Sequence, residues 1–124
     1  MFDHVGLRVR DLAQSTRFFE RVLEPLGHSL QAQGTDYAGF GRQGAPALWL
    51  HDHAPKPGQQ AVGTHVAFTA PSREAVQRFH AAGLAAGGRD NGAPGPRPDY
   101  GDTYYAAFLV DPDGNNVEAV CVKP

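Results

Sequence analysis

Residues 111–118 read Asp-Pro-Asp-Gly-Asn-Asn-Val-Glu, a tight turn that runs directly into an apolar segment. Asp, Pro, Gly and Asn favour turns, each through its own backbone or side-chain preference. The residues on either side, 103–110 and 116–122, are rich in apolar and aromatic side chains and are strand-like. The segment therefore predicts a hairpin whose second strand carries one carboxylate, Glu118, between Val117 and Ala119.

The residues before this hairpin predict a strand followed by a helix. His65–Thr69 has apolar side chains at alternate positions, as in a half-buried strand. Ser72 is a plausible N-cap for a helix that continues through Leu84 and stops at Gly87-Gly88. The Gly- and Pro-rich stretch that follows, as far as Gly101, is compatible with a short strand.

The first half of the chain predicts the same order of elements. Val5, Leu7 and Val9 alternate as in a strand, and Asp11 then provides an N-cap. Apolar residues at helical spacing follow up to Leu26, and Gly27 fits the helix end. Three short apolar runs, residues 28–33, 37–41 and 47–51, are predicted strands.

The two halves repeat with a period near 61 residues, the separation of His4 and His65. A module of this size cannot bury both faces of its sheet, so the two modules must pack together. We therefore predict one α+β domain over residues 1–124, with two βαβββ modules at about 1–53 and 63–124.

Composition and charge are those of an ordinary globular domain. The 124 residues are 41% hydrophobic and 19% charged, with a formal net charge of −2 at pH 7. This balance indicates neither nucleic acid nor an anionic membrane as a partner, and no apolar run approaches the roughly 20 residues that span a bilayer. The N-terminus begins a strand and shows no signal peptide, and the single cysteine, Cys121, favours a buried position. A cytoplasmic location is the default expectation.

Two histidines and one carboxylate occupy matching places in the repeat. His4 and His65 each open the first strand of a module, and Glu118 lies in an apolar strand where a carboxylate needs a partner or a metal. Taken alone, a histidine at a strand start is usually just a partly exposed side chain. Together the three residues suggest a facial triad with open positions for substrate or water.

Three segments carry a resemblance to a known superfamily. They are residues 4–12, the helix with Ser15 and Phe18-Phe19, and residues 111–118. They resemble the vicinal oxygen chelate superfamily, which includes glyoxalase I, fosfomycin and bleomycin resistance proteins, and extradiol dioxygenases. The resemblance covers nearly the whole chain, and the Asp-Pro-Asp-Gly-Asn-x-x-Glu segment is its most specific part.

The resemblance implies a cupped mixed sheet around a divalent metal such as Fe, Mn, Ni or Zn. It places His4, His65 and Glu118 at metal-ligand positions and makes Glu118 a catalytic residue. It also implies a homodimer in which the two modules of one site often come from different subunits. Arg8 matches a position that glyoxalase I uses to bind the carboxylate of its thiol cofactor; a surface arginine beside Arg10 is the simpler alternative.

One departure concerns the fourth ligand of glyoxalase I, a second glutamate on the last strand of module one. Leu48 or Trp49 occupies that position here. His51 shares strand parity with Trp49, and His51 or His53 is a possible substitute, although a solvated loop is the simpler interpretation.

Aromatic residues provide further candidates. Tyr104 and Tyr105 point to opposite faces of their strand, so one of them faces the cup, where a hydroxyl donates to an oxyanion or simply packs. Trp49, Tyr100 and Tyr37 are candidates for an aromatic substrate pocket. His80 and His28 are predicted to be exposed.

Two functions therefore stay open, with a vestigial site on a structural dimer as a third. The first is a metal-dependent enzyme, such as a lyase or isomerase, a dioxygenase or a thiol transferase, that acts on a small oxygen-chelating substrate. The second is a non-catalytic protein of the bleomycin-resistance type, which sequesters a small molecule in an aromatic groove. The complete triad favours the enzyme.

Overall fold

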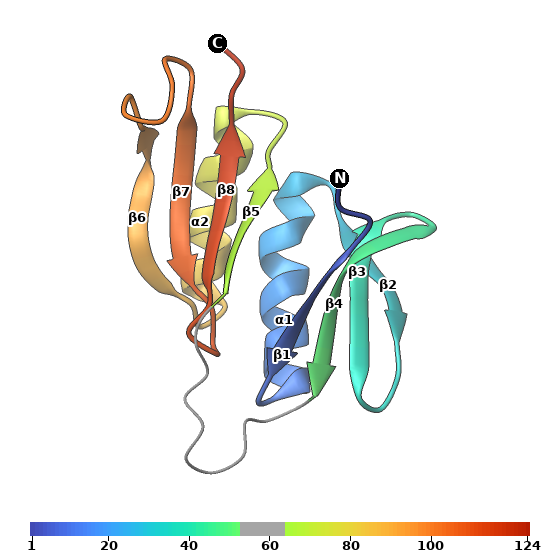
Figure 1. The fold of residues 1–124 in the computed structure, drawn as a ribbon. Helices are drawn as coiled ribbons and strands as arrows, with labels where there is room; N and C mark the ends of the chain where they lie inside the picture. Colours follow the sequence, from blue (N-terminus) through green and yellow to red (C-terminus); the bar gives the residue numbers. More distant parts are fainter. Residues whose placement is uncertain (53–63) are drawn as a thin grey trace.

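The protein is described by a computed structural model that covers residues 1–52 and 64–124. Two modules follow one another along the chain (Figure 1). The first consists of β1 (Val5–Val9), α1 (Leu12–Leu23), the 3-10 helix η1 (Glu24–Leu26), β2 (Ser29–Gln33), β3 (Tyr37–Arg42) and β4 (Ala45–Asp52). The second consists of β5 (His65–Thr69), α2 (Arg73–Ala85), β6 (Arg89–Pro96), β7 (Tyr105–Val110) and β8 (Asn116–Cys121).

Each module forms its own four-stranded mixed sheet. The strand orders are β1-β4-β3-β2 and β5-β8-β7-β6. In each sheet the first strand runs parallel to the last strand of the module, and the other pairs are antiparallel. The predicted α+β fold with two βαβββ modules is therefore confirmed. Within one chain, β1 and β5 lie at the ends of two separate sheets.

Both helices begin where the sequence predicts. The Asp11 side chain accepts a hydrogen bond from the Gln14 backbone at 3.0 Å, and Ser72 caps α2 by accepting one from Ala75 at 3.1 Å. Gly27 ends η1 with a φ of 90°, which glycine adopts without steric cost.

The core lies where each helix packs on its own sheet and the two helices meet. Phe18, Phe19 and Phe79 are completely buried there. Gly83 of α2 lies at the crossing, where an added Cβ would come within 2.2 Å of a Leu109 methyl group and 3.2 Å of Val22 on α1. A glycine at this point lets α2 approach both β7 and α1 closely, and the two modules therefore share one core.

The largest difference from the sequence prediction is β6, an eight-residue strand in the Gly- and Pro-rich stretch where only a short strand was expected. Its glycines and prolines have low strand propensity. They are tolerated because β6 is the edge strand of its sheet, where a missing N–H need not break a ladder. Its pairing with β7 shifts register between Asp90 and Gly92 and again between Gly92 and Gly95.

The prediction that His80 and His28 are exposed is wrong. His80 is 9% exposed, and its Nε2 lies 2.9 Å from Oδ1 of Asp90 on β6. His28 is half-buried, burial and the nearby Arg42 lower its pKa, and its Nδ1 is buried without a hydrogen-bond partner. Helical spacing alone did not show that Asp90 of β6 contacts His80 of α2.

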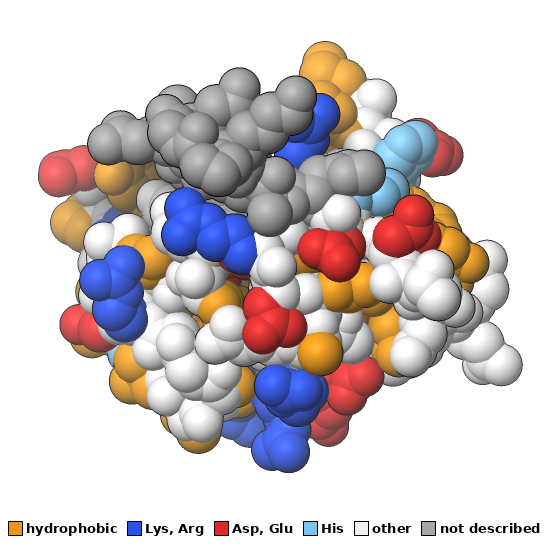
Figure 2. All heavy atoms as spheres, turned by 90° about the horizontal axis from the view of Figure 1, so that it is seen from below, with side chains coloured by type: hydrophobic (Ala, Val, Ile, Leu, Met, Phe, Trp, Pro, Cys, Tyr) orange, Lys and Arg blue, Asp and Glu red, His pale blue; other side chains and the backbone are white. Residues whose placement is uncertain are grey.

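On the side of the molecule seen from below, acidic and basic side chains of the described residues are interspersed (Figure 2). Among the described residues, no helix is both long enough and apolar enough to cross a membrane.

Candidate functional site

The candidate site lies on the face of the second sheet that points away from α2. Tyr105 is on the helix side, because its hydroxyl accepts a hydrogen bond from Gln77 of α2 at 3.0 Å. Side chains alternate along a strand, so Tyr104 and Phe108 point to the opposite face. Phe108 pairs with Glu118 across β7 and β8, which places the carboxylate on that face too.

Three side chains meet there. Oε2 of Glu118 lies 3.1 Å from Nε2 of His65, and the Tyr104 hydroxyl donates to Oε1 of Glu118 at 2.5 Å. Glu118 is only 3% exposed, whereas half of the His65 side chain is exposed. Among the described residues, no lysine or arginine pairs with this carboxylate. The Glu118 carboxylate and the His65 imidazole are two adjacent potential metal donors. The Tyr104 phenol donates a hydrogen bond to the carboxylate and orients it.

Tyr104 holds its proton tightly. Burial, and next the hydrogen bond to Glu118, raise the pKa of this phenol from 10.0 to about 12. The group is therefore a neutral donor at physiological pH. Because its pKa is higher in the folded protein, the phenol favours folding fully below pH 10, and this contribution is lost as the pH rises toward 12.

We expect a spectrophotometric titration of the native protein to show one of the four tyrosines ionising near pH 12, since burial and the hydrogen bond to Glu118 both disfavour the Tyr104 phenolate. The absorbance of phenolate near 295 nm measures this directly. Tyr104→Phe should lose that component alone. A Tyr104→Phe protein that still shows the same step near pH 12 would contradict the assignment.

The turn at residues 111–115 holds the site in place. Asn115 accepts a hydrogen bond from the Thr64 backbone at 3.0 Å, which sets the start of β8 beside the start of β5. The Asp113 carboxylate accepts hydrogen bonds from the Arg10 backbone at 2.8 Å and from the Ser15 hydroxyl at 3.0 Å. The turn thus connects both strands of the site to the first module.

His4 is not part of this cluster within one chain. Its Nδ1 lies 2.7 Å from the Asp3 carboxylate, and its side chain is 59% exposed. Over residues 1–52 and 64–124, no three His, Cys, Asp or Glu side chains gather closely enough to hold a metal. One chain therefore brings together two of the three predicted ligands, His65 and Glu118.

The other predicted residues are spread over both sheets. Arg8 and His51 are exposed and paired across β1 and β4, with the His51 ring over Gly6, so His51 shares a face with Trp49 as expected. Trp49 is half-buried, and its ring centroid lies 6.1 Å from that of Tyr37. Two further positions complete the set. Tyr100 is 67% exposed and packs edge-on against Tyr104 at 5.4 Å, and His53 lies outside the described residues.

Two residues of this face were not identified from the sequence. Phe108 lies nearly parallel to His65, with ring centroids 6.4 Å apart and an interplanar angle of 24°. The Arg97 guanidinium also lies over the Phe108 ring, 5.5 Å from its centroid. Strand alternation could have placed Phe108 on this face, since it lies four residues after Tyr104. It could not have placed Arg97, whose position depends on β6.

Comparison with known proteins agrees with this architecture. The sequence model of the Glyoxalase/Bleomycin resistance protein/Dioxygenase superfamily matches residues 1–119. The chain belongs to this superfamily. The resemblance seen in residues 4–12 and 111–118 is thereby confirmed, because the match spans both segments. A comparison with curated proteins finds no match.

Solved structures of superfamily members have the same fold over nearly the full chain. A glyoxalase/bleomycin resistance protein from Albidiferax ferrireducens T118 is 34% identical, with a TM-score of 0.82 and 98% of each chain covered. A lactoylglutathione lyase from Agrobacterium tumefaciens is 25% identical, with a TM-score of 0.64, covering 98% of this chain and 92% of that one. An enzyme of the family from Burkholderia phytofirmans PsJN, 20% identical at a TM-score of 0.74 over 98% of both chains, shows the fold alone.

Proposed function

We propose that this superfamily member is a divalent-metal-dependent enzyme acting on a small substrate that chelates the metal through two oxygens. Each metal would be held by His65 and Glu118 of one subunit and by His4 of a second copy of the chain. The observation that carries the proposal is the buried Glu118 carboxylate, which lies against an imidazole nitrogen at 3.1 Å and has no lysine or arginine partner among the described residues.

The donor set suits a divalent metal. Imidazole nitrogen and carboxylate oxygen together bind Fe, Mn, Ni and Zn. The Tyr104 hydroxyl leaves Oε2 of Glu118 directed at His65 and fixes the carboxylate through Oε1. Hydrogen bonds of this kind orient metal ligands and raise metal affinity. Two adjacent donors with a fixed orientation fit a site that needs one more ligand.

A second subunit is the natural source of that ligand. Among the strands of residues 1–52 and 64–124, β1 and β5 are edge strands of separate sheets, so each has an unpaired edge that another copy can approach. His4 directly precedes β1, and His65 opens β5, so the two imidazoles are equivalent in the repeat. Joining a first module to the second module of another copy would close the cupped sheet around the site. The proposed assembly is therefore a homodimer with composite sites.

A metal bound there would act as a Lewis acid on the chelated oxygens of the substrate. The chain's own residues would orient and hold protons. Tyr104 keeps its proton at neutral pH and donates a hydrogen bond to Glu118, so it positions this carboxylate. Phe108 lies beside the His65 ring and restricts its rotation, which keeps Nε2 facing Glu118.

The alternative, a non-catalytic protein that sequesters an aromatic molecule, also has support. Tyr37 and Trp49 form an aromatic pair on the first sheet, and no group of three metal ligands is found in the described part of one chain. This alternative needs neither Glu118 nor a metal, so a metal measurement separates the two.

Untagged wild-type protein, purified and incubated with Zn²⁺ or Mn²⁺, is expected to retain about one metal per chain after gel filtration. Glu118→Gln should lose it, since the amide is a poor ligand for these metals. Elemental analysis measures the content. Glu20→Gln is the matched control, because Glu20 is exposed on α1. Wild-type protein that retains no metal but binds planar aromatic molecules would support the sequestering alternative instead.

A further inference from the structure

Arg97 lies on the same face as the proposed metal site. Its backbone N–H donates to the Tyr104 carbonyl at 2.8 Å, so the two residues face each other at the base of the β6–β7 hairpin. Tyr104 reaches Glu118 on this face, and the Arg97 guanidinium lies 5.5 Å from the Phe108 centroid. Phe108 thus lies close to both the guanidinium and the His65 ring, whose centroid is 6.4 Å from its own.

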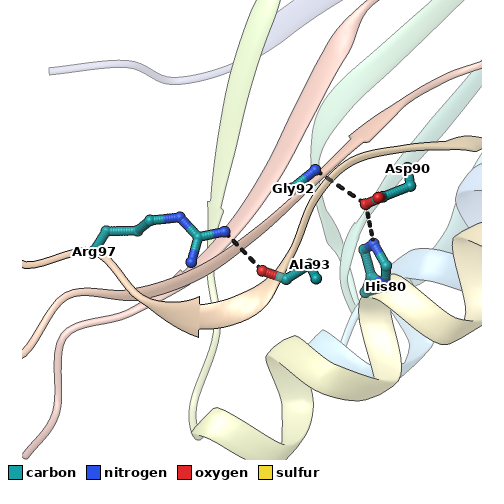
Figure 3. Close-up of polar contacts among 5 residues, drawn as sticks. All are labelled: His80, Asp90, Gly92, Ala93 and Arg97. Carbon is teal, nitrogen blue, oxygen red and sulfur yellow. Dashed lines mark hydrogen bonds and ion pairs between the residues drawn. The ribbon is translucent and has the colours of Figure 1, made fainter.

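Backbone carbonyl groups hold this guanidinium in one position. Nη1 donates to the Gly95 and Pro96 carbonyls at 2.9 and 3.3 Å. Nη2 donates to the Ala93 carbonyl at 2.7 Å (Figure 3). Two glycines leave room for it. An added Cβ at Gly92 would lie 3.3 Å from Nη2, and one at Gly95 would lie 3.2 Å from Nη1. The positive charge is therefore positioned before any ligand arrives.

The strand that carries these carbonyls is itself anchored. Oδ1 of Asp90 lies 2.9 Å from Nε2 of His80 on α2 and accepts the Gly92 N–H at 3.0 Å (Figure 3). These contacts connect the glycine-rich part of β6 to the helix on the other face of the sheet. The guanidinium is thus supported by a rigid element.

The charge of Arg97 is not neutralised within the described part of the chain. All three of its hydrogen-bond acceptors are neutral carbonyls, and no described carboxylate forms an ion pair with it. An arginine stays protonated, and these contacts use three of its five N–H donors. A half-buried cation with unused donors attracts an anion.

We infer that Arg97 binds an anionic group of the substrate, which makes it a specificity-determining residue of the site. The inference rests on the proposed function. The substrate class is then a small molecule with two neighbouring oxygens at one end and a carboxylate, or a similar anion, at the other. The guanidinium and the His65 ring both lie near Phe108, at 5.5 and 6.4 Å from its centroid, so one small molecule such as a dihydroxybenzoate can reach both.

The test uses two probes that differ only in charge, 3,4-dihydroxybenzoate and 3,4-dihydroxybenzamide. Calorimetry with zinc-loaded wild-type protein should show at least about tenfold tighter binding of the benzoate, as expected for one charge-assisted contact. Arg97→Gln should abolish this preference without changing the affinity for the benzamide or the zinc content. Arg97→Lys should retain part of the preference. Arg78→Gln, on the exposed side of α2, is the matched control.

A structural role alone predicts a different result. Arg97→Gln would then lower thermal stability while the ratio of benzoate to benzamide affinity stayed as in wild type, and this result would overturn the inference. Equal binding of both probes to wild-type protein would overturn it too. The pair is also titrated into metal-free protein. If zinc does not bind, this titration decides: an Arg97-dependent preference supports the inference, and the absence of such a preference overturns it. Failure of the metal proposal would appear in two other measurements. Wild-type protein would retain no zinc, or Glu118→Gln would leave the affinity for the benzamide unchanged.

Discussion

Mixed dimers of two inactive variants, His4→Ala and Glu118→Gln, are expected to regain about a quarter of the wild-type metal sites. Each variant alone breaks every composite site. In a mixed dimer, the intact His4 of one subunit meets the intact His65 and Glu118 of the other, so one of two sites is complete. Random pairing makes about half of the dimers mixed. The measurement is zinc retained after the two proteins are co-refolded and gel-filtered.

The matched control mixes two variants within the second module, His65→Ala and Glu118→Gln. No metal should return in that mixture, because His65 and Glu118 contact each other in one chain and each subunit supplies a broken pair. His4→Ala mixed with His65→Ala should behave like the first mixture. A site completed within one chain would give no recovery in any mixture. That result, with wild-type protein binding metal, would contradict sharing between subunits.

The parts of the site predicted from sequence are those that depend on periodicity. Strand alternation gave the opposite faces of Tyr104 and Tyr105, and the structure places Tyr104 beside Glu118 and Tyr105 against α2. Glu118 was expected to need a partner because it lies in an apolar strand, and it contacts His65. The involvement of His4 stays a prediction, since one chain does not bring it to the other two.

The parts not predicted depend on packing between segments of weak local preference. β6 contains Gly92, Gly95 and two prolines, and propensity gives no strand there. It forms because β7 offers a partner edge and α2 supplies His80 for Asp90. Without that strand, neither the burial of His80 nor the position of Arg97 follows from the sequence. Arg97, the residue proposed to select the substrate, could therefore not be predicted from the Gly- and Pro-rich sequence before it.

Replacing Asp111 by alanine is expected to lower the free energy of unfolding by about 3 kcal/mol, because each buried donor left unpaired costs about 1–3 kcal/mol. The Asp111 side chain is buried, and its carboxylate accepts hydrogen bonds from the backbones of Asp113 and Asn115 at 2.9 and 2.8 Å and from the Asn115 amide at 2.9 Å. Loss of the carboxylate releases the turn that sets β8 beside β5. Equilibrium unfolding in urea measures the change.

The control for this variant is Asp102→Ala, an exposed carboxylate in the β6–β7 connection, which should change stability by less than about 0.5 kcal/mol. Equal effects of the two substitutions would show that the turn contributes nothing through Asp111. The Asp111→Ala protein should also retain less zinc than wild type, since Asn115 would no longer be held in position to accept from Thr64.

The stability difference between wild type and Asp111→Ala should also depend on pH in a defined direction. Burial raises the pKa of this carboxyl above its ordinary 3.8, although the hydrogen bonds from Asn115 and Asp113 oppose the shift. The folded protein therefore takes up the proton before the unfolded chain does, and wild type gains stability as the pH falls through the folded-state pKa toward 3.8. The alanine variant has no such group, so the difference should widen in acid. Urea unfolding at pH 7.5 and in mild acid checks this; a difference that narrows in acid would mean that hydrogen bonding, rather than burial, dominates at Asp111.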